Sequence, residues 1–275
     1  MRRRTFWSAL ALALALVAAP AGRAHAQERG SGAVPLDEHT ALMVGQHNLK
    51  LGVGSFEYGI TSFFSVGVDV PAWISGTVSP IFAPNAHVKA ALLDRPDLVV
   101  SARLAGYYVK LSEDLGPANM VVVPAALFGS TRLAKGLWLH GEVNYNWLHA
   151  FAASQVGKGS VNGALATRNS QLGVMADYHF TRVFALYARA RYQLTTTALE
   201  VRGDGRIDDY TTADLGAEIR LKHPHPYMAL GGVAFTWSHV GLVLGAGYGH
   251  LFIPGANVAL PNPGFVPDAE FWVSF

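Results

Sequence analysis

Hydrophobic and polar residues alternate along four stretches of this chain, each eleven residues long. The stretches are Leu137–Trp147, Ser170–Phe180, Phe184–Leu194 and Thr211–Leu221. A period of two puts successive side chains on opposite faces of a β-strand, so each stretch predicts a strand with one apolar and one polar face. Strands of soluble proteins average about five or six residues, whereas a tilted strand that crosses a membrane needs about nine to eleven.

Aromatic residues end several of the apolar faces, as Tyr145 and Trp147 do in the first stretch and Tyr178 and Phe180 do in the second. Bands of aromatic side chains at the two membrane interfaces are typical of barrels that span a bilayer. A soluble β-sandwich also alternates. The length of the stretches, together with their aromatic ends, favours strands that face lipid.

Eight further segments alternate less regularly and predict the remaining strands. They are His47–Tyr58, Phe64–Trp73, Asn85–Leu92, Leu98–Val109, Asn119–Ser130, Tyr227–Phe235, Gly241–Leu251 and Asp268–Phe275. The total is about twelve, with ten or fourteen left open, and bacterial barrels have even counts. In hydrocarbon every backbone N–H and C=O must be paired within the protein, which strands achieve only in a closed sheet. We therefore predict an all-β fold, a transmembrane antiparallel β-barrel.

Turn residues and longer segments separate the predicted strands. Short turns are expected at Leu93–Asp97, Ala134–Gly136, His179–Arg182 and His223–Pro226, and longer loops at Ser75–Pro84, Ala150–Thr167, Thr195–Asp209 and Pro254–Val266. Membrane barrels place short turns at one end and long loops at the other. Twelve strands in this order put most short turns at the long-loop end. Either Ala41–Gln46 forms an extra strand and Tyr227–Leu251 is miscounted, or this barrel departs from the rule.

The composition agrees with strands in apolar surroundings. Hydrophobic residues make up 51% of the 275 residues and charged residues 15%, against about 25% charged in a soluble domain. A formal net charge of +2 excludes binding to nucleic acid through bulk charge, so no nucleic-acid partner is expected. The absence of cysteine excludes disulfides, thiolate metal sites and a lipid anchor on an N-terminal cysteine.

The first 26 residues have the pattern of an export signal. Arg2–Arg4 is basic, Phe6–Ala19 is an apolar run of 14 residues, and Ala24-His25-Ala26 fits the small-x-small cleavage pattern. We expect cleavage between Ala26 and Gln27, a flexible leader over residues 27–36 and a barrel over residues 37–275. An uncleaved anchor helix and a twin-arginine signal are the alternatives.

The C-terminus carries a resemblance to a known family. Ala269, Phe271, Val273 and Phe275 share one face of the last predicted strand, and this pattern resembles the closing strand of bacterial outer-membrane β-barrels. The segment Tyr58-Gly59-Ile60-Thr61 resembles the Tyr-Gly-x-Thr turn of poorly characterised barrels of that kind. The resemblance implies location in the bacterial outer membrane, contact with its lipids, and recognition of Phe271, Val273 and Phe275 by the barrel-assembly machinery. It implies no activity.

Charged and polar residues on the predicted inward faces are the candidate functional groups. They are Lys50, Asp69, His87, Lys89, Arg103, His140, Glu142, Asn144, Asp177, His179, Arg189, Arg191, Asp214, Glu218 and Arg220. One interpretation is a pore lining that sorts solutes by charge. The other is a network of ion pairs that fills the barrel interior, because unpaired charges there would be costly.

Motifs for chemistry are scarce. His140 and Glu142 lie two residues apart on one face, as do Asp177 and His179, and spacing supplies neither pair with a third partner for catalysis or metal binding. The segment Asp204–Asp209 resembles a calcium loop but lacks its final Glu, so we interpret it as an exposed acidic loop. No catalytic residue, no metal ligand and no nucleotide, haem, flavin or other cofactor is predicted.

The sequence therefore predicts an outer-membrane channel or transporter for small solutes. The alternative is a structural or adhesive barrel whose interior is filled by salt bridges and whose loops make the contacts. An enzymatic barrel that acts on lipid or peptide is a third hypothesis without a supporting motif; the chain lacks the His-x-Ser-Asn segment of the outer-membrane phospholipases.

Overall fold

The computed structural model describes residues 40–70, 84–110, 118–156, 159–195, 198–208, 211–220, 225–253 and 258–275. Within these ranges the chain forms fourteen β-strands. They are β1 (Leu49–Gly52), β2 (Ser55–Thr61), β3 (Phe64–Asp69), β4 (Asn85–Arg95), β5 (Leu98–Lys110), β6 (Ala118–Ala134), β7 (Leu137–Val156), β8 (Gly159–His179), β9 (Phe184–Thr195), β10 (Ala198–Asp208), β11 (Thr211–Arg220), β12 (Tyr227–Thr236), β13 (Val240–Ile253) and β14 (Val258–Ser274). No helix among the described residues is long and apolar enough to cross a membrane.

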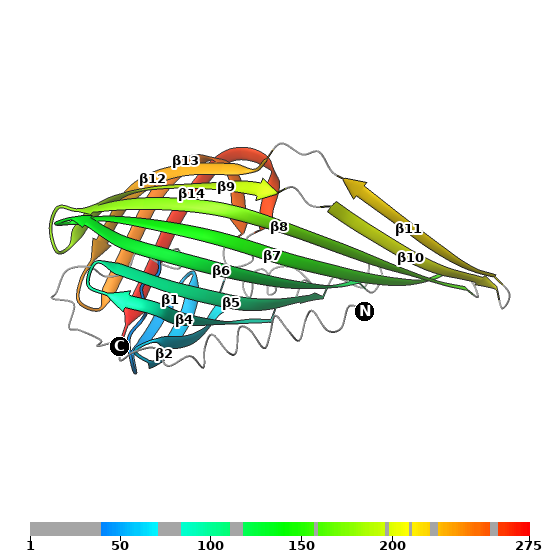
Figure 1. The fold of residues 1–275 in the computed structure, drawn as a ribbon, viewed down its shortest axis with the longest axis horizontal. Helices are drawn as coiled ribbons and strands as arrows, with labels where there is room; N and C mark the ends of the chain where they lie inside the picture. The colour runs from blue at the N-terminus through cyan, green and yellow to red at the C-terminus, as the bar shows by residue number, and fades with distance from the viewer. Residues whose placement is uncertain are drawn as a thin grey trace.

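The strands form one antiparallel sheet that closes into a barrel (Figure 1). Strand β8 pairs with β7 on one side and with β9 on the other, and β9 continues through β12, β13 and β14 to β1. Strands β10 and β11 stand outside this ring, which leaves twelve strands in the wall. The predicted closed barrel of about twelve strands is confirmed.

The first and last wall strands meet along a short seam. Lys50 lies opposite Ser274, and Leu51 lies opposite Val273. The backbone N–H of Leu49 donates to the carbonyl of Phe275 at 3.1 Å, and the N–H of Phe275 donates to the carbonyl of Leu49 at 3.0 Å. The final residue of the chain therefore completes the closed backbone ladder.

The links after β2, β4, β6, β8 and β12 are all short and lie at one end of the barrel, which we call the short-turn end. The two-residue turn after β1 lies at the opposite end. The predicted conflict over the short turns is thereby removed. The segment His47–Tyr58, predicted as one strand, is the hairpin of β1 and β2 with a turn at Val53-Gly54. This additional reversal moves every later turn to the opposite end. Residues Thr40–Val44 form no strand, so the extra strand proposed over Ala41–Gln46 is also wrong.

The segment Thr211–Leu221 was predicted as a wall strand, and this assignment is wrong. Its described part, β11, pairs with β10, and β10 in turn pairs with residues 160–166 of β8. The two strands form a hairpin beside the 20-residue β7 and the 21-residue β8, which together project beyond the ring (Figure 1). Most of the predicted loops Ala150–Thr167 and Thr195–Asp209 is strand in this projection. Strands β11 and β12 run in the same direction and are not the two arms of a hairpin. Residues 221–224, which include the start of the turn predicted at His223–Pro226, lie outside the described residues.

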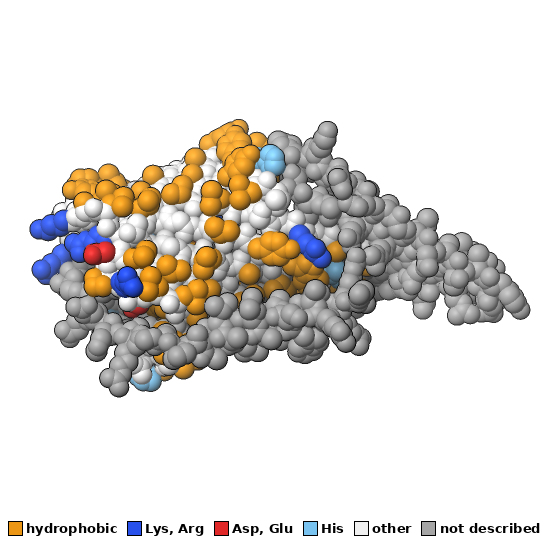
Figure 2. Space-filling model, in the orientation of Figure 1, with side chains coloured by type: hydrophobic (Ala, Val, Ile, Leu, Met, Phe, Trp, Pro, Cys, Tyr) orange, Lys and Arg blue, Asp and Glu red, His pale blue; other side chains and the backbone are white. Residues whose placement is uncertain are grey.

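Burial is inverted relative to a soluble protein. On β7, Val143 and Tyr145 are 49% and 48% exposed, whereas Asn144 and Asn146 are each 1% exposed. Figure 2 shows apolar side chains spread over the flank of the barrel, with most of the charged side chains in this view at the short-turn end. Placing apolar side chains outside and polar ones inside is unfavourable in water and favourable when the outer surface meets hydrocarbon.

The Tyr58-Gly59-Ile60-Thr61 segment has a steric reason for its glycine. A Cβ atom on Gly59 would lie 1.7 Å from the carbonyl oxygen of Gly45. The backbone N–H of His47 donates to the carbonyl of Gly59 at 2.7 Å, so the chain that enters the wall crosses directly over this position. The motif thus marks the place where the segment before β1 packs against β2.

We expect Gly59→Ala to lower the free energy of unfolding by about 1–3 kcal/mol, because backbone must move to admit the methyl group. The measurement is urea unfolding of protein refolded into phospholipid vesicles, followed by tryptophan fluorescence. Gly106→Ala is the matched control, because a Cβ there meets nothing within 4 Å. Equal destabilisation by the two substitutions would contradict the steric explanation.

Candidate functional site in the barrel interior

The wall strands bring most of the predicted polar residues to the inside of the barrel. The side chains of the following predicted residues lie on the inner face and are buried or nearly so: Lys50, Asp69, His87, Lys89, Arg103, His140, Glu142, Asn144, Asp177, His179, Arg189 and Arg191. The other three, Asp214, Glu218 and Arg220, lie on β11, which is not a strand of the ring. The prediction that these three residues line the barrel is therefore wrong. They were selected by alternation, and a strand outside the ring alternates in the same way as a wall strand.

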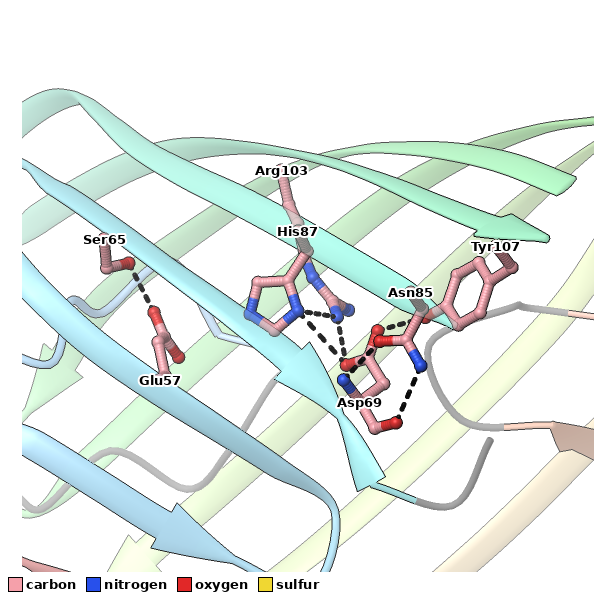
Figure 3. A network of polar contacts seen from close by, with 7 residues as sticks. All are labelled: Glu57, Ser65, Asp69, Asn85, His87, Arg103 and Tyr107. Carbon is pink, nitrogen blue, oxygen red and sulfur yellow. Dashed lines mark hydrogen bonds and ion pairs between the residues drawn. The ribbon is translucent and has the colours of Figure 1, made fainter. Parts of the chain in front are cut away.

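Asp69 is the centre of a polar cluster built by three neighbouring strands (Figure 3). Its carboxylate accepts hydrogen bonds from Arg103 Nη2 at 2.5 Å and from the hydroxyl of Tyr107, and lies 3.3 Å from His87 Nδ1. Asn85 Oδ1 accepts a hydrogen bond from the backbone N–H of Asp69 at 2.6 Å, and Asn85 Nδ2 donates to the backbone carbonyl of Asp69 at 3.0 Å. Both oxygens and the backbone of this 1% exposed residue are thus bound.

A second ion pair spans three strands. The side chain of Arg191 on β9 donates to Glu142 on β7 at 2.5 Å, although β8 lies between them. Gly173 of β8 makes this contact possible, because a Cβ there would lie 2.3 Å from Glu142 Oε1. The guanidinium carbon of Arg191 lies 5.2 Å from the ring centroid of Phe252 on β13. These side chains lie along the wall and neutralise each other there.

Further acid–base pairs continue this pattern around the ring. Lys50 donates to Glu270 at 3.3 Å across the β1–β14 seam. Tyr187 and Arg189 reach Asp268 at 2.6 and 3.4 Å. Glu57 accepts a hydrogen bond from Ser65.

Opposite charges nearly balance in the described part of the interior. The charged side chains on the inner face of the described wall strands that are buried or joined in the ion pairs above comprise six acids and five bases. They are Glu57, Asp69, Glu142, Asp177, Asp268 and Glu270, with Lys50, Lys89, Arg103, Arg189 and Arg191. An interior of this kind presents many polar atoms but little net field.

A chain of hydrogen bonds crosses β6, β7 and β8 near the short-turn end. His140 Nδ1 lies 2.7 Å from Ser130 Oγ, and His140 Nε2 lies 2.6 Å from Asp177 Oδ2. Asp177 Oδ1 in turn lies 2.7 Å from His179 Nε2. The sequence did not identify Ser130 as a functional residue. Its contact with His140 arises from the register of β6 and β7, which places the two residues directly opposite each other.

Ser130, His140 and Asp177 have the order of contacts found in a nucleophile–base–carboxylate triad. Catalysis also requires an accessible hydroxyl and donors for an oxyanion. The Ser130 side chain is fully buried, and its oxygen already accepts the backbone N–H of Ala41 at 2.8 Å. In this arrangement the three residues hold a segment of the chain in place. Within the described residues, no group of three or more His, Asp or Glu is placed to hold a metal ion.

The segment that precedes β1 lies inside the barrel, which the sequence did not predict. Thr40, Ala41 and Leu42 are 0%, 0% and 6% exposed and belong to no strand. Lys89 Nζ donates to the carbonyls of Thr40 and Leu42 at 2.9 and 2.8 Å. No periodicity in so short a segment could have signalled this position.

Known families and curated proteins provide no match to this sequence. Among solved structures, the chain is similar to the translocator domain of autotransporter NalP from Neisseria meningitidis, with 11% identity, a TM-score of 0.43, and 82% of this chain and 84% of that one covered. The TodX monoaromatic hydrocarbon channel matches with 12% identity and a TM-score of 0.43 over 82% and 64% of the two chains. An outer membrane channel from Pseudomonas putida F1 matches with 12% identity and a TM-score of 0.33 over 88% and 100%. All three scores are below 0.5, so the fold rests on the strand pairing and burial described above.

Proposed function

We propose that this chain is a bacterial outer-membrane channel for small polar solutes, and that the arrangement described above is its closed state. The observation that carries the proposal is the inverted burial of the wall, with apolar side chains outside and bound polar side chains inside. Because hydrocarbon cannot hydrogen-bond, a β-sheet is stable in it only when the sheet is closed and its outer face is apolar. The polar inner face then offers solutes a path lined by hydrogen-bonding groups.

Export and assembly complete this proposal. We propose that residues 1–26 are a cleaved signal peptide, followed by a leader over residues 27–36; both lie outside the described residues. Phe271 and Phe275 face outward and are 46% and 68% exposed, while Trp272 between them is 2% exposed. This outward apolar edge is our candidate for recognition by the barrel-assembly machinery.

Single-channel recording in planar bilayers tests the proposal. We expect brief, low-conductance openings with nearly equal permeability to cations and anions, because the inward charges nearly balance. The permeability ratio follows from the reversal potential in a tenfold salt gradient. A strongly ion-selective current would contradict the proposed neutral lining.

A second candidate function has its own observation. Strands β7 and β8, with the hairpin of β10 and β11, project beyond the ring (Figure 1). A sealed barrel that presents this projection as a contact surface would pass no current at any voltage. If the refolded and correctly inserted protein, and also the variants described in the next subsection, pass no ionic current, this function is favoured over the channel.

A further inference from the structure

The interior holds three consecutive residues that are not part of the wall. Thr40, Ala41 and Leu42 are buried at the level of Ser130 and Val99, which lie close to the turns after β6 and before β5. The short-turn end of the barrel is therefore occupied by the chain's own segment, which we call the plug (residues 40–44).

The site that receives the plug binds polypeptide backbone. Lys89 Nζ donates to two plug carbonyls, and Ser130 Oγ accepts the plug N–H of Ala41. Ala41 and Leu42 pack against Val99 and Phe128, over which Lys89 also lies at 5.5 Å from the ring centroid. Three backbone contacts and an apolar wall form a seat for one short stretch of chain.

The contacts of the plug differ from those that hold the wall. Wall strands are joined by continuous backbone ladders, whereas the contacts of Thr40–Leu42 named above are made by side chains of the seat. The chain leaves the seat through Gly45 and His47, whose φ angles of 93° and 60° make a sharp bend before β1. Withdrawal of the plug therefore leaves the ladder in place.

We propose that residues 40–44 are a releasable plug, which binds to the seat formed by Lys89, Ser130, Val99 and Phe128. Release of the plug from this seat opens the barrel. The opening role rests on the proposed channel function; the release of the plug does not. Ser130 is positioned by His140 and Asp177, so the hydrogen-bonded chain on β6, β7 and β8 sets the orientation of the hydroxyl that the plug engages.

Single introduced cysteines test the release of the plug, because the native chain has none. The thiol that Leu42→Cys places in the full chain should react slowly with a polyethylene-glycol maleimide in vesicles. Lys89→Met with Ala41→Pro removes the Lys89 donors and the Ala41 N–H, and should speed this reaction about tenfold or more. Two further single cysteines are the controls. Leu133→Cys replaces a residue that is 59% exposed and should react fast in both backgrounds. Val266→Cys replaces a buried wall residue outside the seat and should react slowly in both. Unchanged reactivity of the thiol at position 42 would overturn the plug.

A reversible cross-link tests the consequence for conduction. Leu42 and Val99 pack in one cluster, so Leu42→Cys with Val99→Cys should form a disulfide on oxidation. We expect the oxidised protein to be silent in planar bilayers and the reduced protein to open. Current that is the same before and after reduction overturns the plug while leaving the channel intact. Faster labelling of the thiol at position 42 without current in any variant overturns the channel while leaving the plug intact.

Discussion

Val143→Arg is expected to destabilise the protein in a bilayer by about 2–4 kcal/mol, the cost of an arginine on the lipid face near the membrane midplane. Val143 lies on β7 opposite Leu127 and Leu172 on the neighbouring strands, and the three are 47–49% exposed. It is about 23 Å along the strand from Gly136, and a tilt of 35–45° converts this length to a depth of about 16–19 Å. The measurement is urea unfolding from phospholipid vesicles.

Leu133→Arg is the matched control for this substitution. Leu133 is also exposed and apolar, but it lies at the short-turn end between Arg132 and Lys135. An arginine there remains in contact with water, so its cost should be about 0–1 kcal/mol. Equal costs at the two positions would show that the apolar outer face does not meet hydrocarbon, and the membrane proposal would be lost.

Asp69→Asn is expected to lower the free energy of unfolding by about 3–5 kcal/mol, because it leaves a buried guanidinium without its counter-charge. The Asp69 and Arg103 side chains are 1% and 9% exposed. Asn keeps the shape of Asp, so the loss reports the charge. Urea unfolding of the refolded protein measures it, and Asp97→Asn at an exposed turn is the control.

The double substitution Asp69→Asn with Arg103→Met separates an ion pair from simple packing. Removing both charges eliminates the unbalanced guanidinium, so more than half of the stability lost in Asp69→Asn should return. A double variant that is as unstable as the sum of the two single variants would show that the pair contributes through shape and hydrogen bonds instead.

The interior pairs also bear on the proposed function. Glu142 passes over Gly173 to reach Arg191, so the pair lies along the wall instead of across the barrel. Charges that are neutralised at the wall do not need the plug for compensation. This arrangement is what allows a closed interior and a releasable plug to exist in one molecule.

Alternation alone determined the position of most wall strands and their two faces. Positions such as Val143 and Asn144 differ in burial as their period of two predicts, because a strand turns successive side chains to opposite sides. The even count and the closed sheet followed from the need to pair every backbone group in hydrocarbon. The location of the inward charges on the wall strands was also within reach of the sequence.

Only the tertiary structure decided which strand pairs with which and what lies inside. The strand β11 alternates as well as β9 does, yet it joins β10 outside the ring, because periodicity fixes a face and not a partner. Ser130 meets His140 through the register of β6 and β7, and Lys89 meets residue 40 across 49 positions of sequence. Contacts of this kind depend on strand register and chain reversal, which are set by the whole closed sheet and leave no local pattern in the residues that make them.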